Sequence, residues 1–144
     1  MVNTATPKSL EFTLPSDFAA QQIVHERIVS QIQQAGSTKR DEFAIRLALE
    51  EALTNAMKHG NKMAPDKNVF VKSTVDNATV TIEIEDEGDG FTLDALPDPT
   101  ADENLGRASG RGVLLIKSFM DSAEYNEKGN RLVMSKLLGQ EASV

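Results

Sequence analysis

The sequence has no cysteine, only two histidines and no long apolar run, and each of these absences excludes a class of protein. Without cysteine the chain can form neither disulfides nor a thiolate metal site. His25 and His59 are too far apart in sequence to have a recognisable metal-ligand spacing. No apolar run approaches the roughly 20 residues that a membrane-spanning helix needs. The first ten residues contain a single lysine and no apolar segment that could serve as a signal peptide. We therefore expect a cytoplasmic protein with no membrane partner.

Basic residues are also fewer than acidic residues. The chain has 15 Lys and Arg against 22 Asp and Glu, which gives a formal net charge of −7 and a pI near 4.8. Nucleic acids and anionic membranes need a basic footprint, so neither is expected as a direct partner. An anionic small molecule is not excluded, because a few cations and backbone N–H groups can hold a phosphate. The 144 residues, 40% apolar and 26% charged, predict a single globular domain over 1–144 with its core at about 10–138.

Hydrophobic periodicity and capping residues predict the element order β–α–α–β–β–loop–α–β–β. The expected strands cover 10–14, 69–75, 79–85, about 122–126 and 130–138, and the expected helices run from 16 or 17 to 34, from 37 or 38 to 60, and from 110 to about 119. The first helix is expected to bury Phe18, Ile23, Val24, Ile28 and Ile32. Strands adjacent in sequence favour a mostly antiparallel sheet. Helices covering one face of that sheet would give a two-layer α/β sandwich.

Glu51 and Asn55 are the most informative pair in the chain. They lie four residues apart in a stretch free of Pro and Gly, so they project from one helical face about one turn apart. A carboxylate on a helix that is otherwise buried is costly unless it lines a wet or functional cavity. The alternative is a solvent-facing polar stripe, which we expect for Glu50, about 100° around the helix from Glu51. The neighbours that make this helix look buried are Phe43, Ala44, Leu47, Ala48, Ala52, Leu53 and Ala56.

Two glycine-containing segments are further candidates for ligand contacts. Residues 86–90 follow a strand directly, and their glycines would let the backbone approach a planar ligand while Asp86 accepts a hydrogen bond from an exocyclic amine. An acidic turn is the alternative. Residues 106–112 precede a helix, whose free N–H groups and positive dipole end suit an anion. Arg107 and Arg111 favour phosphate there, although they could equally be surface charges on a flexible hinge.

The combination and order of these motifs are more specific than any one of them. A helix with E-x-x-x-N, a strand ending in D-x-G-x-G and a G-x-G before a helix resemble the N, G1 and G2 boxes of the gyrase/histidine-kinase (GHKL) superfamily of ATPases, over about 10–138. Within that superfamily, E-A-L-T-N-A-x-x-H-G, D-E-G-x-G-F and G-R-G-x-x-L-I in a short chain resemble the anti-sigma-factor serine/threonine-protein kinases. The resemblance implies a Bergerat-type fold that binds ATP and Mg²⁺. It also implies a kinase that sequesters a sigma factor and phosphorylates an anti-anti-sigma antagonist, in a family where homodimers are frequent.

The resemblance also implies a role for each motif residue. Asn55 would be the Mg²⁺ ligand, since a carboxamide oxygen suits a hard cation. Glu51 would be the general base that receives the hydroxyl proton of a serine or threonine, and Asp86 would bind the adenine amino group. Residues 92–109 would act as a lid. The other cofactor-binding residues would be Gly88 and Gly90 beside the adenine, and Arg107, Gly110, Arg111 and Gly112 at the phosphates.

One departure from the family pattern keeps other functions open. Many relatives have a Gly-Thr pair in the late hairpin that supports the adenine site, whereas this chain has Gly129-Asn130. A nucleotide-gated binding module that holds a partner without phosphotransfer is therefore an alternative to the kinase. A catalytic half that serves a histidine-containing phosphotransfer protein is a third interpretation.

Overall fold

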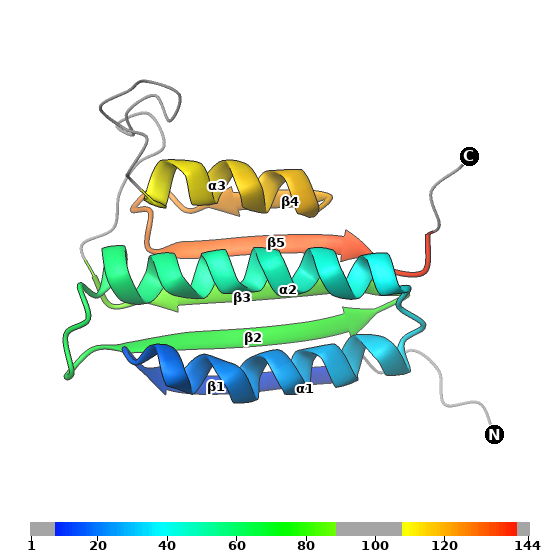
Figure 1. The fold of residues 1–144 in the computed structure, drawn as a ribbon, viewed down its shortest axis with the longest axis horizontal. Helices are drawn as coiled ribbons and strands as arrows, with labels where there is room; N and C mark the ends of the chain where they lie inside the picture. The colour runs from blue at the N-terminus through cyan, green and yellow to red at the C-terminus, as the bar shows by residue number, and fades with distance from the viewer. Residues whose placement is uncertain (1–7, 89–107, 141–144) are drawn as a thin grey trace.

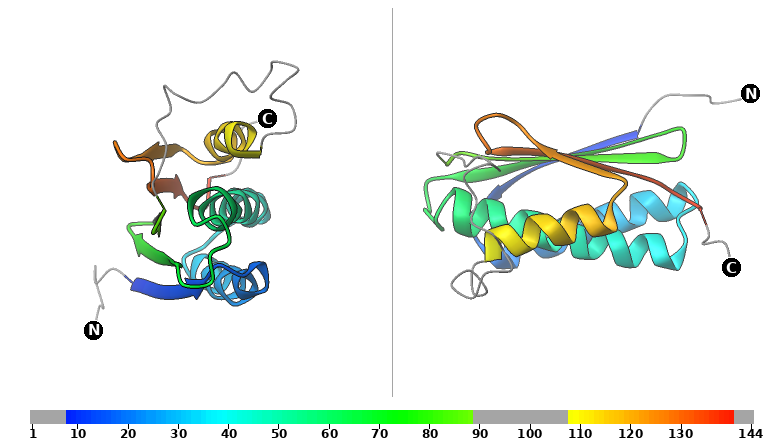
Figure 2. Two further views of the ribbon diagram at one scale, coloured as in Figure 1. Left: turned by 90° about the vertical axis from the view of Figure 1, so that its left-hand side faces the viewer. Right: turned by 90° about the horizontal axis from the view of Figure 1, so that it is seen from above.

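The computed structural model describes residues 8–88 and 108–140, which form one five-stranded sheet with helices on a single face (Figures 1 and 2). The strands are β1 (Lys8–Pro15), β2 (Asn68–Asp76), β3 (Thr79–Asp86), β4 (Ser122–Tyr125) and β5 (Arg131–Leu137). Their spatial order is β1-β2-β3-β5-β4, and every pairing between these strands is antiparallel. The predicted two-layer sandwich with a mostly antiparallel sheet is confirmed.

The helices also follow the predicted order. They are α1 (Gln21–Gln34), α2 (Lys39–Thr54) and α3 (Ala108–Phe119), with a short 3₁₀ helix η1 (Phe18–Ala20) before α1 and a π-helical segment η2 (Asn55–Gly60) after α2. In Figure 2 α2 lies between α1 and α3. None of the described helices has both the length and the apolarity that crossing a membrane requires.

Side-chain caps fix where these helices begin. Asp17 accepts a hydrogen bond from the Ala19 N–H at 3.0 Å, which caps η1. Thr38 and Asp41 form a reciprocal capping box at the start of α2, with hydrogen bonds of 2.9 and 3.0 Å. The buried Asp41 carboxylate also accepts the Gly139 N–H at 2.7 Å, so the same cap ties α2 to the segment that follows β5.

The core lies between the helical layer and the sheet. Its largest fully buried side chains come from α1 (Val24, Ile28, Ile32), α2 (Ile45, Leu49, Leu53), η2 (Met57), α3 (Ile116) and the sheet (Val69, Ile82, Leu132, Met134). Each strand of the sheet contributes alternate residues to this core, which is the period-2 pattern that the sequence shows.

Three side chains that the pattern assigned to buried faces are exposed instead. Phe18 and Ile23 are each 48% exposed, because the inward face of α1 is formed by residues spaced three or four apart and Phe18 belongs to the separate η1 turn. Phe43 is 61% exposed on the outer face of α2. Its ring meets that of Phe119 edge-on, with the ring centroids 6.2 Å apart. The apolar pattern therefore predicted that more of α2 is buried than the structure shows.

Candidate functional site

Asn55 lies where the regular winding of α2 gives way to the π-helical segment η2. The Asn61 N–H donates to the Ala56 carbonyl, five residues back, at 2.8 Å. Such wide turns are rare and occur frequently at functional sites. The single helix predicted to reach Gly60 is thus divided, and the change of winding begins at the predicted metal ligand.

Asn55 and Asp86, predicted from two separate motifs, line one narrow cleft between the helical layer and the sheet. The cleft is nearly closed in this structure, with about 10 Å³ of free volume, roughly the space of one water molecule. It is lined by Ala52, Asn55 and Ala56 from the helical side, Ile84 and Asp86 from β3, and Tyr125, Asn130 and Leu132 from the end of the sheet. Most of the lining is apolar, so the few polar groups in it are conspicuous.

The carboxamide of Asn55 is buried without well-formed hydrogen bonds. The residue is 3% exposed, and neither the side-chain oxygen nor the nitrogen has a partner of good geometry among residues 8–88 and 108–140. It interacts electrostatically with the Tyr125 hydroxyl, which lines the same cleft. A buried polar group left in this state typically costs the folded protein about 1–3 kcal/mol. Asn55 is therefore placed as a ligand-binding group would be, at the expense of stability.

The Asp86 carboxyl, 6% exposed, lies at the end of β3 on the same cleft. Burial raises the pKa of Asp86 to about 6, while the hydrogen bond from the Gly88 N–H acts in the opposite direction and Glu85 adds to the rise. The Gly88 N–H reaches Asp86 Oδ1 at 2.8 Å. This carboxyl is thus an acceptor held in place by its own turn, with an elevated proton affinity.

Gly60 and Gly88 bring two segments of backbone into close contact around Asp86. A Cβ at Gly60 would overlap the Asp86 carboxyl group, and a Cβ at Gly88 would overlap the Gly60 carbonyl. Only glycine therefore fits at either position. Gly88 was predicted as a close-approach residue, but its close neighbour in the structure is the end of η2. Gly60 was predicted only as a helix end.

Asn61 is a structural residue of the site that the motifs do not single out. It is 1% exposed, and its amide group donates to Ser16 Oγ at 3.0 Å and to the Asn68 carbonyl at 2.9 Å. Its side-chain oxygen accepts the Glu87 N–H at 2.8 Å. Asn61 therefore ties the turn after β3 to the start of β2 and to the segment before η1.

Asn130, where the chain departs from the Gly-Thr pattern, supports Asp86 through the backbone. Its amide group donates to the Asp86 carbonyl at 3.1 Å, and its own backbone carbonyl accepts the Asp86 N–H at 2.9 Å. Its side-chain oxygen accepts a hydrogen bond from Asn126 at 2.9 Å. The turn between β4 and β5 thereby holds the end of β3 in position.

Glu51 lies on the last turn of α2, half-buried, one turn before Asn55. It does not line the described part of the cleft. Glu50 is exposed, as predicted. The buried Nε2 of His59 has no hydrogen-bond partner among the described residues, and burial lowers the pKa of its imidazole.

The remaining predicted site residues lie at or beyond the edge of the described structure. Gly90 and Arg107, with residues 92–107 of the expected lid, lie outside it. Gly110 and Arg111 fall within the first four residues of α3, whose N–H groups lack intrahelical acceptors, and Gly112 is the fifth. The helix therefore begins before these glycines rather than after them. Residues 8–88 and 108–140 contain no group of three acidic, histidine or cysteine side chains able to hold a metal.

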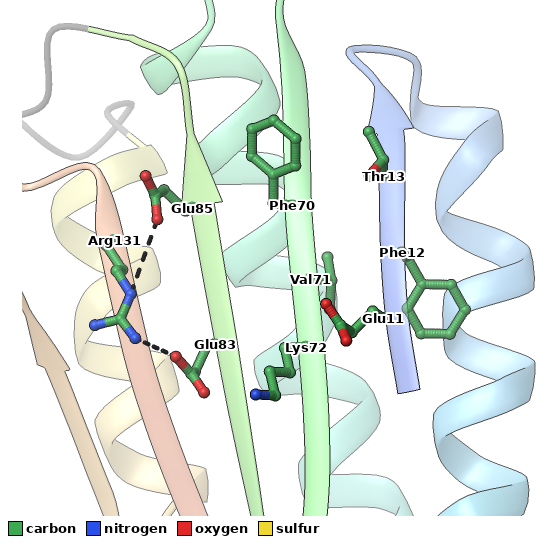
Figure 3. Close-up of a pocket in the computed structure, with 9 residues that line it drawn as sticks. All are labelled: Glu11, Phe12, Thr13, Phe70, Val71, Lys72, Glu83, Glu85 and Arg131. Carbon is green, nitrogen blue, oxygen red and sulfur yellow. Dashed lines mark hydrogen bonds and ion pairs between the residues drawn. The ribbon is translucent and has the colours of Figure 1, made fainter. Parts of the chain in front are cut away.

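A larger hollow lies on the opposite face of the sheet, away from the helices (Figure 3). A cavity of about 220 Å³ lies there between side chains of β1, β2, β3 and β5. Arg131 already pairs with Glu83 and Glu85 at this surface. None of the predicted site residues lines the hollow, so its size does not make it the better candidate.

The chain is similar to a known domain family and to several named proteins. Residues 15–136 match the model of the histidine kinase-like ATPase domain. The anti-sigma F factor of Oceanobacillus iheyensis is 32% identical over 123 residues, which cover 81% of this chain and 84% of that protein. The anti-sigma F factor of Clostridium perfringens is 36% identical over 98 residues, 64% of this chain and 69% of that protein. The serine-protein kinase RsbW of Staphylococcus aureus is 28% identical over 142 residues, 92% of this chain and 88% of that protein.

Proposed function

We propose, from the premise that the chain belongs to the histidine kinase-like ATPase domain family, that it is an ATP-dependent anti-sigma kinase. It would sequester a sigma factor and phosphorylate an anti-anti-sigma antagonist on serine or threonine. The observation that carries the proposal is the meeting of Asn55 and Asp86, both buried, in one cleft. The names of the relatives, anti-sigma F factor and serine-protein kinase, support the regulatory role.

The residues at the cleft fit a nucleotide with Mg²⁺. A buried carboxamide oxygen without a well-formed hydrogen bond is a suitable ligand for a hard cation that keeps several waters. Asn55 would hold the metal, which when bound supplies charge neutralisation at the phosphates. The Asp86 carboxylate would accept a hydrogen bond from the adenine amino group. The N-terminal N–H groups of α3 would face the phosphates.

Glu51 would act as the general base. In the proposed transfer, the substrate hydroxyl oxygen forms a bond to the γ-phosphorus while the bond from that phosphorus to the oxygen of the departing ADP breaks. The hydroxyl proton passes to the Glu51 carboxylate. Glu51, on the last turn of α2, lies about one helical turn before Asn55, the first residue of η2, so the base and the metal ligand would be neighbours along the helix.

The test is incubation of the purified protein with Mg-ATP and its cognate antagonist. We expect phosphoserine or phosphothreonine on the antagonist, lost in Glu51→Ala. The matched control is Glu50→Ala, which removes the same side chain from the neighbouring exposed position and should transfer phosphate normally. If the antagonist gains no phosphate and Glu51→Ala behaves like the wild type, the kinase proposal is wrong. An acid-labile product would indicate phosphohistidine instead.

A nucleotide-gated binding module is the second proposal, and Asn130 is the observation that favours it. The amide of this residue is engaged with the Asp86 backbone rather than directed to a ligand. The module predicts ADP or ATP affinity that is lost in Asp86→Asn, together with partner release but no phosphate transfer. The same incubation distinguishes the two functions.

A further inference from the structure

The peptide group that joins Asp86 to Glu87 lies where the strand pairing of the sheet ends. The ladder between β2 and β3 stops at the pair Val69–Asp86. The ladder between β3 and β5 stops at the pair Glu85–Arg131. Beyond these pairs the direction of a peptide plane depends on φ and ψ, which are the soft torsions of the backbone. The direction of this plane matters for the cleft, because the peptide begins at the residue that carries the Asp86 carboxyl.

Two asparagine side chains from distant parts of the chain hold this one peptide at both ends. The Asn61 side-chain oxygen accepts the Glu87 N–H at 2.8 Å, across 26 positions of sequence. The Asn130 amide group donates to the Asp86 carbonyl at 3.1 Å, across 44 positions. Because the donor and the acceptor of the peptide are both engaged, its plane cannot rotate without breaking at least one of these two hydrogen bonds.

The Asn61 carboxamide is itself fixed in one orientation. The residue is 1% exposed, and its amide group donates to Ser16 Oγ at 3.0 Å and to the Asn68 carbonyl at 2.9 Å. A reversed carboxamide would face its donors to the Glu87 N–H and its acceptor to the Asn68 carbonyl. The Glu87 carboxylate also accepts the Asn68 N–H at 2.7 Å. The peptide is therefore held against the start of β2, not only against its own turn.

The Asp86 carboxyl depends on the direction of this peptide. The Gly88 N–H donates to Asp86 Oδ1 at 2.8 Å, so the carboxyl is bonded to the turn that the clamped peptide begins. Rotation of the peptide would shift the Gly88 N–H relative to the carboxyl and release it. The two asparagines therefore act on the direction of the Asp86 carboxyl, although both of them bond to backbone atoms.

We propose that Asn61 and Asn130 are positioning residues that clamp the peptide after Asp86, and that this clamp sets the preference of the site for a purine with an amino group. The inference rests on the proposed function, since it takes Asp86 as the acceptor of the adenine amino group. A site built around one hydrogen bond rejects an analogue that lacks the donor, because the buried acceptor is left unpaired. That rejection requires an acceptor with a fixed direction, which the clamp supplies.

The experiment is calorimetric titration, in the presence of Mg²⁺, of ADP and of purine riboside diphosphate, which is ADP without the amino group. The wild type should bind ADP about 10–100-fold more tightly than the analogue, the effect of one hydrogen bond to a charged acceptor. Asp86→Ala should remove this preference and so define its full size. Asn61→Ala and Asn130→Ala should each lower the preference by about fivefold, the effect of one neutral hydrogen bond. Their affinity for the analogue should be unchanged.

Gln31→Ala is the matched control for general loosening of the fold. Gln31 is another buried carboxamide with both ends bonded: it donates to the Lys8 and Ser73 carbonyls at 3.0 and 3.1 Å and accepts the Ser73 hydroxyl at 2.6 Å. None of these residues lines the cleft. Gln31→Ala should therefore destabilise the protein and keep the wild-type preference for ADP over the analogue.

Four results would overturn the positioning role. They are an unchanged preference in Asn61→Ala and Asn130→Ala, an equal loss of affinity for both nucleotides in these variants, a preference lowered as much by Gln31→Ala, and a wild type that binds both nucleotides equally. If Asn61→Ala does not fold, Asn130→Ala decides the outcome, because it changes a half-buried residue of a turn. A wild type that binds neither nucleotide would instead refute the proposed function.

Discussion

Replacing Asn55 by leucine should stabilise the nucleotide-free protein while it removes Mg²⁺-dependent binding. The carboxamide is 3% exposed and both of its polar atoms lack well-formed hydrogen bonds in the described residues. Its neighbours in the cleft include Ala52, Ile84 and Leu132, which a leucine side chain can contact. The substitution therefore exchanges a poorly satisfied polar group for an apolar one of similar size.

The magnitude follows from two contributions and one loss. Removing the unsatisfied carboxamide recovers part of a penalty of about 1–3 kcal/mol. Leucine is also a better helix former than asparagine, by about 0.5 kcal/mol. The Tyr125 hydroxyl loses its contact with Asn55, which offsets part of the gain. We expect the free energy of unfolding to rise by about 1 kcal/mol, a shift in Tm of a few degrees for a domain of this size.

Nucleotide should reverse this order of stability. A ligand present at about 100 times its Kd stabilises the folded state by about 2.7 kcal/mol. With saturating Mg-ADP, the wild type should therefore become the more stable protein, whereas Asn55→Leu should gain much less. Urea denaturation of both proteins, with and without Mg-ADP, measures the free energy of unfolding in each state.

Asn61 provides the matched control. It is also a buried asparagine, but both ends of its carboxamide are hydrogen-bonded. Asn61→Leu leaves buried partners unpaired and should lower the free energy of unfolding by about 2–5 kcal/mol, at about 1–3 kcal/mol for each group left unsatisfied. If Asn55→Leu unfolds at lower urea than the wild type without nucleotide, the reasoning from hydrogen-bond satisfaction is refuted.

Two further predictions concern Asp86. Its pKa in the folded protein is about 6, above the ordinary 3.8, so between these values the native state holds a proton that the unfolded chain has lost. Stability should fall as pH rises through this window, and the ADP affinity of the wild type should rise, because the ionised carboxylate is the better acceptor. Urea denaturation at several pH values should give a flatter stability profile for Asp86→Asn than for the wild type, and equally steep profiles would exclude Asp86; ADP titration of the wild type over the same pH range measures the affinity. Gly60→Ala should abolish ADP binding in calorimetry, because the added methyl group overlaps the Asp86 carboxyl; wild-type affinity would show that this contact does not position Asp86.

Much of the fold could be predicted from local pattern. Strand alternation, the cap at Asp17 and the capping box at Thr38 act over a few residues, and the structure confirms the elements that they predict. The exposure of Phe43 could not be predicted this way. It depends on which face of α2 is left uncovered between α1 and α3. In the sequence alone, an apolar residue on that face cannot be distinguished from a core residue.

Some residues of the candidate site could also be predicted from the sequence, and others could not. Asn55 and Asp86 belong to continuous motifs, and the resemblance built on those motifs is confirmed by the family match. The role of Asn61 depends on contacts across long separations in sequence, such as the hydrogen bond from Asn61 to Ser16, 45 positions away. Nothing in the local sequence marks such partners. The phosphate-binding roles of Gly110 and Gly112 stay predictions.

The structure also distinguishes residues of one type by whether their side chains are fully hydrogen-bonded. Asn55, Asn61 and Asn130 are the same residue type near one cleft, but only Asn55 lacks well-formed partners among the described residues. Asn130 donates to the Asp86 carbonyl and accepts from Asn126, so it is engaged as Asn61 is. The support that Asn130 gives to Asp86 in this chain therefore runs through the Asp86 backbone. Because the Asp86 side chain keeps its own place in the cleft, the departure from the family pattern is no argument against adenine binding.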